Sequence, residues 1–266
     1  MGLIRTRVTS IAAYLSERVR YGTPEVSGAI RGDLLFLLDG VGGLQFSPLL
    51  ARRALRQVDS PVATILFDWQ YGLRGEIWTD LMWLRRNRVM GARLARRILS
   101  FRRAHPQTRI HVLAFSGGAG IAVFAGERLR GRPVIDTLIL ACPALSPSYD
   151  LSAALKCVVR CYAWISSRDR WVLGLGTRVF GTTDRCFGPS AGLLGFQIPK
   201  GLPDEEARVY ERLREVHWSS ALGAEGHYGG HTAWAAVGFL RAHLLSMLRG
   251  QPILPTHEVG RFPLQR

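Results

Sequence analysis

Lysine is almost absent from this sequence. Only Lys156 and Lys200 occur among the 35 basic residues, and the others are all arginines, so that the net charge is +15. Nucleic-acid-binding modules more often gather mixed lysine and arginine on one patch, with aromatic residues between them. No such patch stands out in the sequence, so the basic charge does not indicate a nucleic-acid partner.

Long apolar runs are lacking as well. The stretches 34–38 and 138–145 are far shorter than the roughly 18 residues that a membrane-spanning helix needs. The first 22 residues carry charges every few positions and have no uninterrupted apolar core of the kind found in signal peptides. We therefore expect no transmembrane segment and a cytoplasmic location.

Cysteine is scarce, and its spacing is uninformative about metals. The sequence has no C-x-x-C pair and no histidine at the spacing of a metal finger. It therefore predicts free, buried thiols, no metal site and no organic cofactor. The four cysteines are Cys142, Cys157, Cys161 and Cys186.

Repeats and low-complexity tracts are absent, and short β-type runs alternate with longer helical ones instead. This alternation predicts one α/β domain over residues 1–266, with a mostly parallel sheet of about six strands and helices on both faces. Residues 1–22 are expected to form an amphipathic helix, and residues 171–215 a cap or pocket-covering insertion. The expected strands are 33–39, 62–68, 109–115, 137–142, 158–165 and 216–221.

Arginines are densest in the segment 79–103, which has helical periodicity. Apolar residues such as Trp83, Leu94 and Ile98 share one side of this helix, while most of its arginines lie on the others. The pattern favours a helix packed on the core with a solvated basic face. The alternative is a surface that binds a partner or an anionic membrane, so peripheral membrane contact stays open.

The segment Ala114-Phe115-Ser116-Gly117-Gly118 carries the strongest chemical signal. A strand runs into a helix through Ser116, with small residues two places before and two places after it, at Ala114 and Gly118. A nucleophile elbow requires this pattern, because the sharp turn leaves no room for larger flanking side chains. The start of the helix would also direct N–H groups at a developing oxyanion.

Two further segments supply candidate partners for Ser116. The Gly-rich turn after the strand 33–39 would provide a second oxyanion donor, the Val41 N–H. Asp169 follows the strand 158–165, where a carboxylate can orient an imidazole. His227 and His231 both lie in the loop before the last helix. We favour His231 as the base because two glycines precede it and the helix begins directly after it.

The order Ser116, Asp169, His231 resembles that of the α/β-hydrolase superfamily, over residues 30 to 250. The resemblance implies a serine hydrolase with Ser116 as nucleophile, His231 as general base and Asp169 as the acid that orients it. Val41 and Gly117 would donate the oxyanion hydrogen bonds. Three features depart from the family pattern: Asp39 precedes Gly40, Ala114 replaces the first elbow glycine, and a helix replaces the usual opening strands.

The expected substrate is a small carboxylic ester or thioester. Apolar residues in the stretch 171–201 would form a wall over the serine suited to an acyl chain or an aromatic ester, or would only cover the core. The rival function is a non-catalytic protein of the same fold that binds a partner or an anionic surface through its arginine-rich face.

Overall fold

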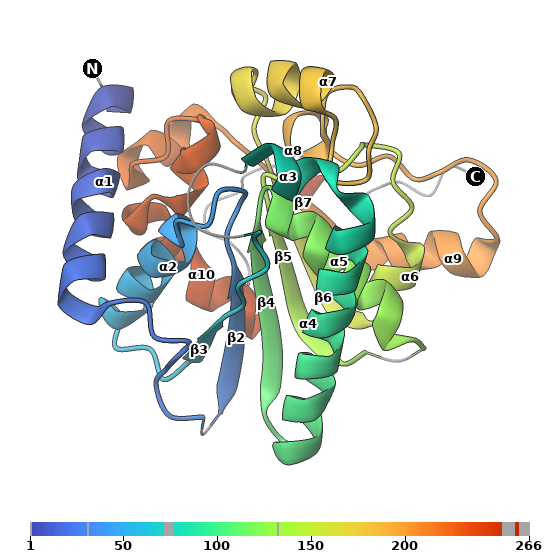
Figure 1. The fold of residues 1–266 in the computed structure, drawn as a ribbon, viewed down its shortest axis with the longest axis horizontal. Coiled ribbons are helices and arrows are strands. Elements are labelled where there is room, and N and C mark those ends of the chain that lie inside the picture. The colour runs from blue at the N-terminus through green and yellow to red at the C-terminus, as the bar shows by residue number, and fades with distance from the viewer. Residues whose placement is uncertain (1, 31, 72–76, 132, 252–258, 261–266) are drawn as a thin grey trace.

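A computed structural model describes residues 2–30, 32–71, 77–131, 133–251 and 259–260 (Figure 1). Within them, eight strands form one sheet in the order β1-β3-β2-β4-β5-β6-β7-β8. The strands are β1 (Val26–Ser27), β2 (Asp33–Leu38), β3 (Ala63–Leu66), β4 (Arg109–Phe115), β5 (Ile135–Ala141), β6 (Val158–Ile165), β7 (Leu213–His217) and β8 (Val259–Gly260). The six strands from β2 to β7 are parallel, which confirms the predicted sheet, and the two-residue strands β1 and β8 add an antiparallel pair at each edge.

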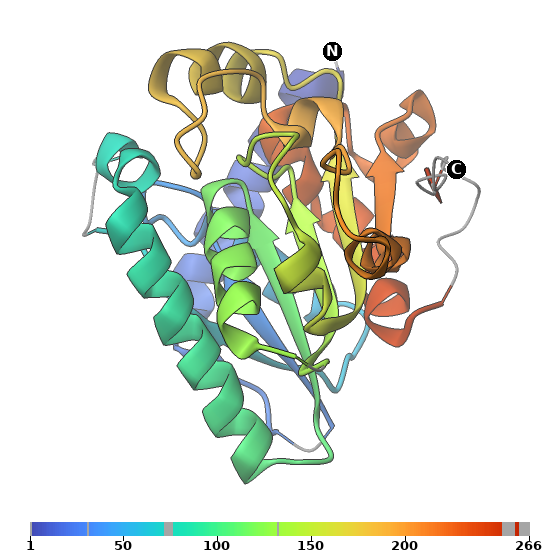
Figure 2. The ribbon, with the colours of Figure 1, turned by 90° about the vertical axis from the view of Figure 1, so that its right-hand side faces the viewer.

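Helices cover both faces of the sheet, as predicted (Figures 1 and 2). One face carries α1 (Gly2–Tyr21), α2 (Phe46–Arg56) and α10 (Val237–Arg249), and the other carries α4 (Leu84–Ala104), α5 (Gly117–Leu129) and α6 (Ser152–Leu155). In β2, Leu34 and Phe36 belong to one core and Leu35 and Leu37 to the other. The strand is thus apolar along its whole length, because both of its faces are buried.

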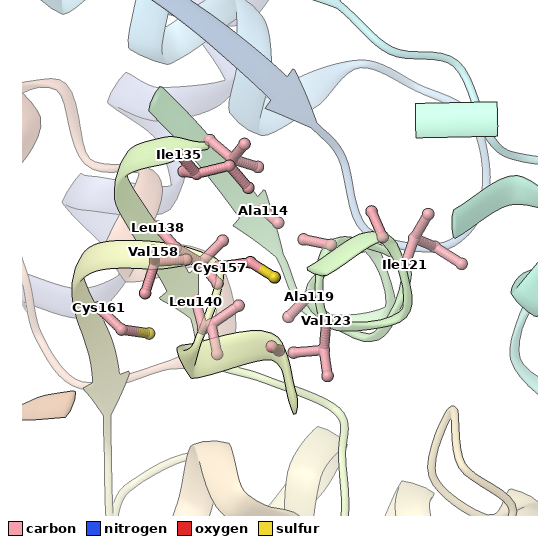
Figure 3. Packing of buried hydrophobic residues seen from close by; sticks show 14 of the residues in the cluster. Ala114, Ala119, Ile121, Val123, Ile135, Leu138, Leu140, Cys157, Val158 and Cys161 are labelled. Carbon is pink, nitrogen blue, oxygen red and sulfur yellow. The ribbon is translucent and has the colours of Figure 1, made fainter. Parts of the chain in front are cut away.

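The core beneath α5 is built from small and branched side chains. Figure 3 shows residues of α5, such as Ala119 and Val123, against residues of β5 and β6, such as Leu140 and Cys161. On its other side α5 meets α4, where a Cβ added to Gly91 would come within 2.6 Å of the Phe124 Cβ. Small residues therefore allow α4 and α5 to pack closely and fix the start of α5 against the sheet.

The remaining helices are short and lie mostly near the carboxyl ends of the strands. They are α3 (Ile77–Met82), α7 (Thr177–Phe180), α8 (Ala191–Leu194) and α9 (Asp204–Arg208), together with the helical turns η1 (Trp171–Gly176), η2 (Val209–Arg212), η3 (Ser220–Glu225) and η4 (His231–Ala235). Figure 2 shows η1 and α7 beyond the tips of the strands. Part of the predicted cap region therefore lies at the edge of the sheet where the candidate residues gather.

Two predicted elements differ in their boundaries. The predicted helix 79–103 is interrupted at Trp83, which separates α3 from α4. The last parallel strand spans 213–217 rather than 216–221, because Leu213, Arg214 and Glu215 already pair with β6. Glu215 is buried there, and its carboxylate accepts a hydrogen bond from the Phe196 N–H at 2.6 Å.

The strand order changes direction at β2. This strand lies between β3 and β4, so that the chain leaves β2 toward one edge of the sheet and leaves β4 toward the other. Ligands of open α/β sheets bind at such a switch point.

The predicted amphipathic helix at the N-terminus is present as α1, but its apolar side faces away from the protein. Val8, Ile11, Leu15 and Val19 are exposed. The side chain of Ile4, which belongs to the same predicted stripe, lies outside the described part of the structure. Hydrophobic periodicity thus identified the helix but not the face that packs.

Candidate active site

Ser116 occupies the turn between β4 and α5 in an unusual backbone conformation. Its φ and ψ are 49° and −116°, in a region that non-glycine residues seldom adopt. The Ser116 N–H donates to the carbonyl of Ala141 at 2.8 Å, and the Ser116 carbonyl accepts hydrogen bonds from the N–H groups of Ala119 and Ala144, both at 3.1 Å. Hydrogen bonds from both sides of the turn therefore hold the strained residue in place.

The two small flanking residues have different surroundings. A Cβ on Gly118 would lie 2.4 Å from the carbonyl oxygen of Asp39, so the loop after β2 leaves no room for a side chain there. Ala114 is fully buried within β4, between Leu38 of β2 and Leu140 of β5. The glycine is thus required by the close approach of a backbone, and the alanine by the density of the sheet.

Three candidate residues form a continuous hydrogen-bonded chain. The Ser116 Oγ lies 3.1 Å from the Nε2 of His231, and the Nδ1 of His231 lies 2.5 Å from the Oδ2 of Asp169. The three side chains come from the ends of β4, of β6 and of the segment after β7. The structure therefore brings together three residues that lie up to 115 positions apart in the sequence.

Burial and charge act in opposite directions on His231. Burial by itself lowers the pKa of this imidazole, but the neighbouring Cys142 and the Asp169 carboxylate raise the pKa, which ends well above its usual 6.5. Asp169 is almost completely buried. Its carboxylate, rather than the thiol of Cys142, is the neighbour that raises the pKa of His231 at neutral pH. Burial raises the pKa of the Cys142 thiol, which keeps that group uncharged.

Cys142 is a neighbour of the site that its spacing in the sequence did not reveal. It follows β5 with a φ of 42°, is fully buried, and its Sγ lies 3.8 Å from the carbonyl oxygen of His231. Cys157 and Cys161 are also buried and unpaired, as predicted, whereas Cys186 is unpaired but exposed.

His227 lies in a different environment from His231. Its ring is fully buried and packs edge-on against Trp234, with centroids 4.0 Å apart, and against Phe239. Its Nδ1 accepts a hydrogen bond from the Gly229 N–H at 3.1 Å. Of the two candidate bases, only His231 is hydrogen-bonded to Ser116 in the structure, and His227 packs in the core beneath the loop.

The loop after β2 passes beside Ser116. A Cβ on Gly40 would lie 3.3 Å from the Ser116 Cβ, and one on Gly117 would lie 3.0 Å from the Cγ1 of Val41. Val41 and Gly117, the predicted oxyanion donors, are therefore neighbours next to the serine. The loop and the start of α5 therefore lie against each other beside Ser116.

Two buried groups, the Asp39 carboxylate and the Trp69 ring, hold the loop after β2 in place. The Asp39 carboxylate accepts hydrogen bonds from the N–H groups of Phe46 and Ser47 and from the Ser47 hydroxyl, which closes the loop onto the start of α2. Burial raises the pKa of Asp39, although these hydrogen bonds oppose the increase. The Trp69 Nε1 donates to the Asp39 carbonyl at 2.8 Å, and its ring lies beside Gly117 and Gly118.

Asp80, on α3, holds the same loop from the side. Its carboxylate accepts hydrogen bonds from the Gly42 N–H at 3.0 Å and from the Tyr71 N–H at 2.7 Å. Arg86 lies 3.7 Å from it, and the pKa of Asp80 is raised, chiefly by burial. The interruption of the helix at Trp83 permits this, because α3 can then turn Asp80 toward the loop.

Sequence reasoning did not assign functions to Trp69 and Asp80. Trp69 directly follows the predicted strand 62–68, and the carboxyl ends of parallel strands meet at one edge, so its position was a usable signal. Asp80 gave none, because it lay inside the predicted helix 79–103. A residue whose partners are backbone N–H groups leaves no pattern of side chains in the sequence.

The apolar side chains of the stretch 171–201 fall into a buried and an exposed group. Leu173 and Phe196 are buried in the cores, whereas Trp171, Leu175 and Phe187 are exposed, Trp171 by 80%. The described residues contain no group of three or more His, Cys, Asp or Glu side chains suited to hold a metal ion. No helix in the described ranges is long and apolar enough to cross a membrane.

The parallel sheet, with Ser116 on a sharp turn between the carboxyl end of β4 and α5, agrees with the predicted architecture. The chain has the α/β-hydrolase fold. No family model matches the sequence, and no curated protein is similar to it.

Among solved structures, this chain is similar to a cutinase-like protein and two esterases. A cutinase-like protein from Cryptococcus sp. is 15% identical, with a TM-score of 0.45, over 85% of this chain and 99% of that chain. Carboxylesterase CesB from Bacillus subtilis is 13% identical, with a TM-score of 0.44, over 93% and 100% of the two chains. An acetylxylan esterase is 11% identical, with a TM-score of 0.43, over 84% and 100%. Such distant likeness gives no information about the substrate.

Proposed function

We propose that this protein is a serine hydrolase that cleaves a carboxylic ester or thioester through an acyl-enzyme intermediate. The observation that supports it is the hydrogen-bonded chain from the Ser116 hydroxyl through His231 to Asp169. A serine hydroxyl is a weak nucleophile, and an adjacent imidazole that accepts its proton makes it reactive.

In the acylation step, the Ser116 Oγ attacks the substrate carbonyl while its proton passes to the Nε2 of His231. Asp169 holds the Nδ1–H of the ring and stabilises the imidazolium that forms. The former carbonyl oxygen becomes negatively charged and accepts hydrogen bonds from the N–H groups of Val41 and Gly117. His231 then returns its proton to the departing alcohol or thiol, and the acyl group stays on Ser116.

In the deacylation step, water replaces the alcohol. It gives a proton to His231 and attacks the acyl carbon, and collapse of the second tetrahedral intermediate releases the carboxylic acid. The proton on His231 returns to the Ser116 Oγ. The cycle consumes one water and requires neither a metal nor an organic cofactor.

Labelling with a fluorophosphonate tests this proposal, because the reagent modifies only a serine whose hydroxyl is activated. We expect a single adduct on the native chain, located to the peptide that contains Ser116 by mass spectrometry, and no adduct on Ser116→Ala. Absence of labelling on a folded native chain, or labelling that persists in the variant, would contradict the proposal.

A further inference from the structure

The outer face of α1 combines exposed apolar side chains with positive charge. Val8, Ile11, Leu15 and Val19 follow one another at intervals of three or four residues and lie on one side of the helix. They are 60%, 52%, 52% and 87% exposed, respectively. Figure 1 shows α1 at the edge of the molecule, with no other element outside it. This stripe is therefore an uncovered apolar surface on one side of a single helix.

Specific polar contacts hold the helix in this orientation. Glu17 is buried and forms ion pairs with Arg53 and Arg56 of α2. The Tyr14 hydroxyl donates to the Leu44 carbonyl at 2.8 Å, and the Tyr14 ring packs against Phe46. Ser10, Tyr14 and Glu17 thus face the protein, whereas the aliphatic stripe of α1 faces outward, the reverse of an ordinary surface helix.

The outer face is basic as well as apolar. Glu17 is the only acidic residue of α1, and its charge is directed inward. Arg18 and Arg20 are exposed in the last turn, where the guanidinium of Arg20 lies 5.4 Å from the centroid of the Tyr21 ring. An anionic surface can therefore approach α1 without meeting an exposed carboxylate of this helix.

Charge distinguishes between the surfaces that could cover this face. A second copy would bring two arginine-bearing helices together, between chains that each carry a net charge of +15. A bilayer with anionic lipid accepts aliphatic side chains at the headgroup boundary and attracts the arginines beside them. An exposed tyrosine at the end of the helix also suits the membrane–water boundary.

We propose that α1 docks this protein on an anionic membrane surface, with Val8, Ile11, Leu15 and Val19 inserted at the headgroup boundary. The helix lies against η4, which begins at His231, so docking would hold the candidate active site at a fixed position relative to the bilayer. Docking itself does not require a working catalytic serine, and its test uses binding rather than hydrolysis.

Co-sedimentation with vesicles tests this proposal directly. The native chain is mixed with vesicles of phosphatidylcholine alone, or of phosphatidylcholine and phosphatidylglycerol in a ratio of three to one. We expect binding to the anionic vesicles that is at least about tenfold tighter than to the neutral ones, and weaker binding as the salt rises to about 0.15 M.

Two pairs of variants, each with a matched control, locate the docking surface. Ile11→Gln with Leu15→Gln removes apolar contact from α1, and Val89→Gln with Val159→Gln removes two exposed valines elsewhere. We expect the first pair to weaken binding at least about tenfold and the second to have little effect. All four positions are exposed, so the variants should fold, as circular dichroism can verify.

A second pair of variants compares the arginines of α1 with those of the arginine-rich helix α4. Arg18→Gln with Arg20→Gln should weaken binding about tenfold or more, whereas Arg85→Gln with Arg93→Gln, which removes the same charge from α4, should not. Absence of binding by the native chain, equal loss in the test and control pairs, or loss only with the α4 pair would overturn the proposal. So would a native dimer, seen in sedimentation velocity, that Ile11→Gln with Leu15→Gln dissociates while the vesicles bind neither form.

Discussion

The two sides of Ser116 are built differently. On one side, the Asp169 carboxylate is hydrogen-bonded to the His231 ring, which can exchange a proton with the serine. On the other side, the carboxylates of Asp39 and Asp80 accept hydrogen bonds from backbone N–H groups and hold a loop. Buried carboxylates thus make two kinds of contact at one site: one is hydrogen-bonded to an imidazole, and the others accept hydrogen bonds from the backbone.

The largest expected effect comes from removing the Ser116 hydroxyl, which lies between the two sides. Ser116→Ala should lower the turnover of an activated ester on the order of 10⁵-fold or more, because no nucleophile remains. The fold should survive, since alanine fits the turn. Steady-state kinetics and a thermal melt measure the two effects, with Ser100→Ala on the exposed side of α4 as the control. Turnover near that of the native chain would show that the nucleophile lies elsewhere.

The next effect separates the two histidines of one loop. His231→Ala should lower turnover on the order of 10⁴-fold or more, because the serine loses its base. His227→Phe retains a ring against Trp234 and should keep turnover within about tenfold. It should lose about 1–3 kcal/mol of stability, because the Gly229 N–H loses its acceptor. A denaturant titration measures that loss. The opposite ranking of activities would assign the base to His227.

The third prediction concerns the pH dependence of activity, which Asp169 should affect through the pKa of His231. Only the neutral imidazole can accept the serine proton, so kcat/KM should rise with pH and level off above the pKa of His231, which lies above 6.5. Asp169→Asn should lower kcat on the order of 10³- to 10⁴-fold and move the midpoint of the rise to lower pH. A pH–rate profile of both proteins measures this. A midpoint that does not move would show that Asp169 does not set the pKa of the base.

The smallest of these effects concerns the backbone side. In Asp80→Asn, one oxygen becomes an amide NH₂ group that cannot accept the hydrogen bond from Gly42 or Tyr71. The loop then shifts, and kcat should fall about tenfold to a hundredfold while KM changes little. The pH midpoint should stay unchanged, which distinguishes this variant from Asp169→Asn. Asp204→Asn, at the start of α9, is the control, and a kcat equal to that of the native chain would show that the loop needs no such support.

The comparison also explains what the sequence could predict. Continuous apolar runs such as β2 identified the parallel strands, because burial on both faces leaves that pattern. Ser116, Asp169 and His231 could be selected because each follows a strand and each carries a side chain with its own chemistry. The order of these residues along the chain then suggested their arrangement.

Other features depended on tertiary contacts that no local pattern records. The support by Asp80 depends on a helix break at Trp83, and the place of His227 depends on an aromatic cluster that forms only in the folded chain. The orientation of α1 was also beyond prediction, since its periodicity is that of a packed helix. Ion pairs to α2, more than thirty residues away, and the contacts of Tyr14 hold one face inward.

The ion pairs of Glu17 with Arg53 and Arg56 make the attachment of α1 sensitive to ionic strength. Dissolved salt weakens the attraction between the buried Glu17 and the partly exposed Arg53 and Arg56, although less than it weakens a fully exposed pair, whereas α2 and α10 are held to the sheet by apolar contacts that salt does not weaken. Salt would therefore promote local opening of α1 while the sheet stays folded. The protein would then have two opening free energies, one for a single helix and one for the rest of the chain.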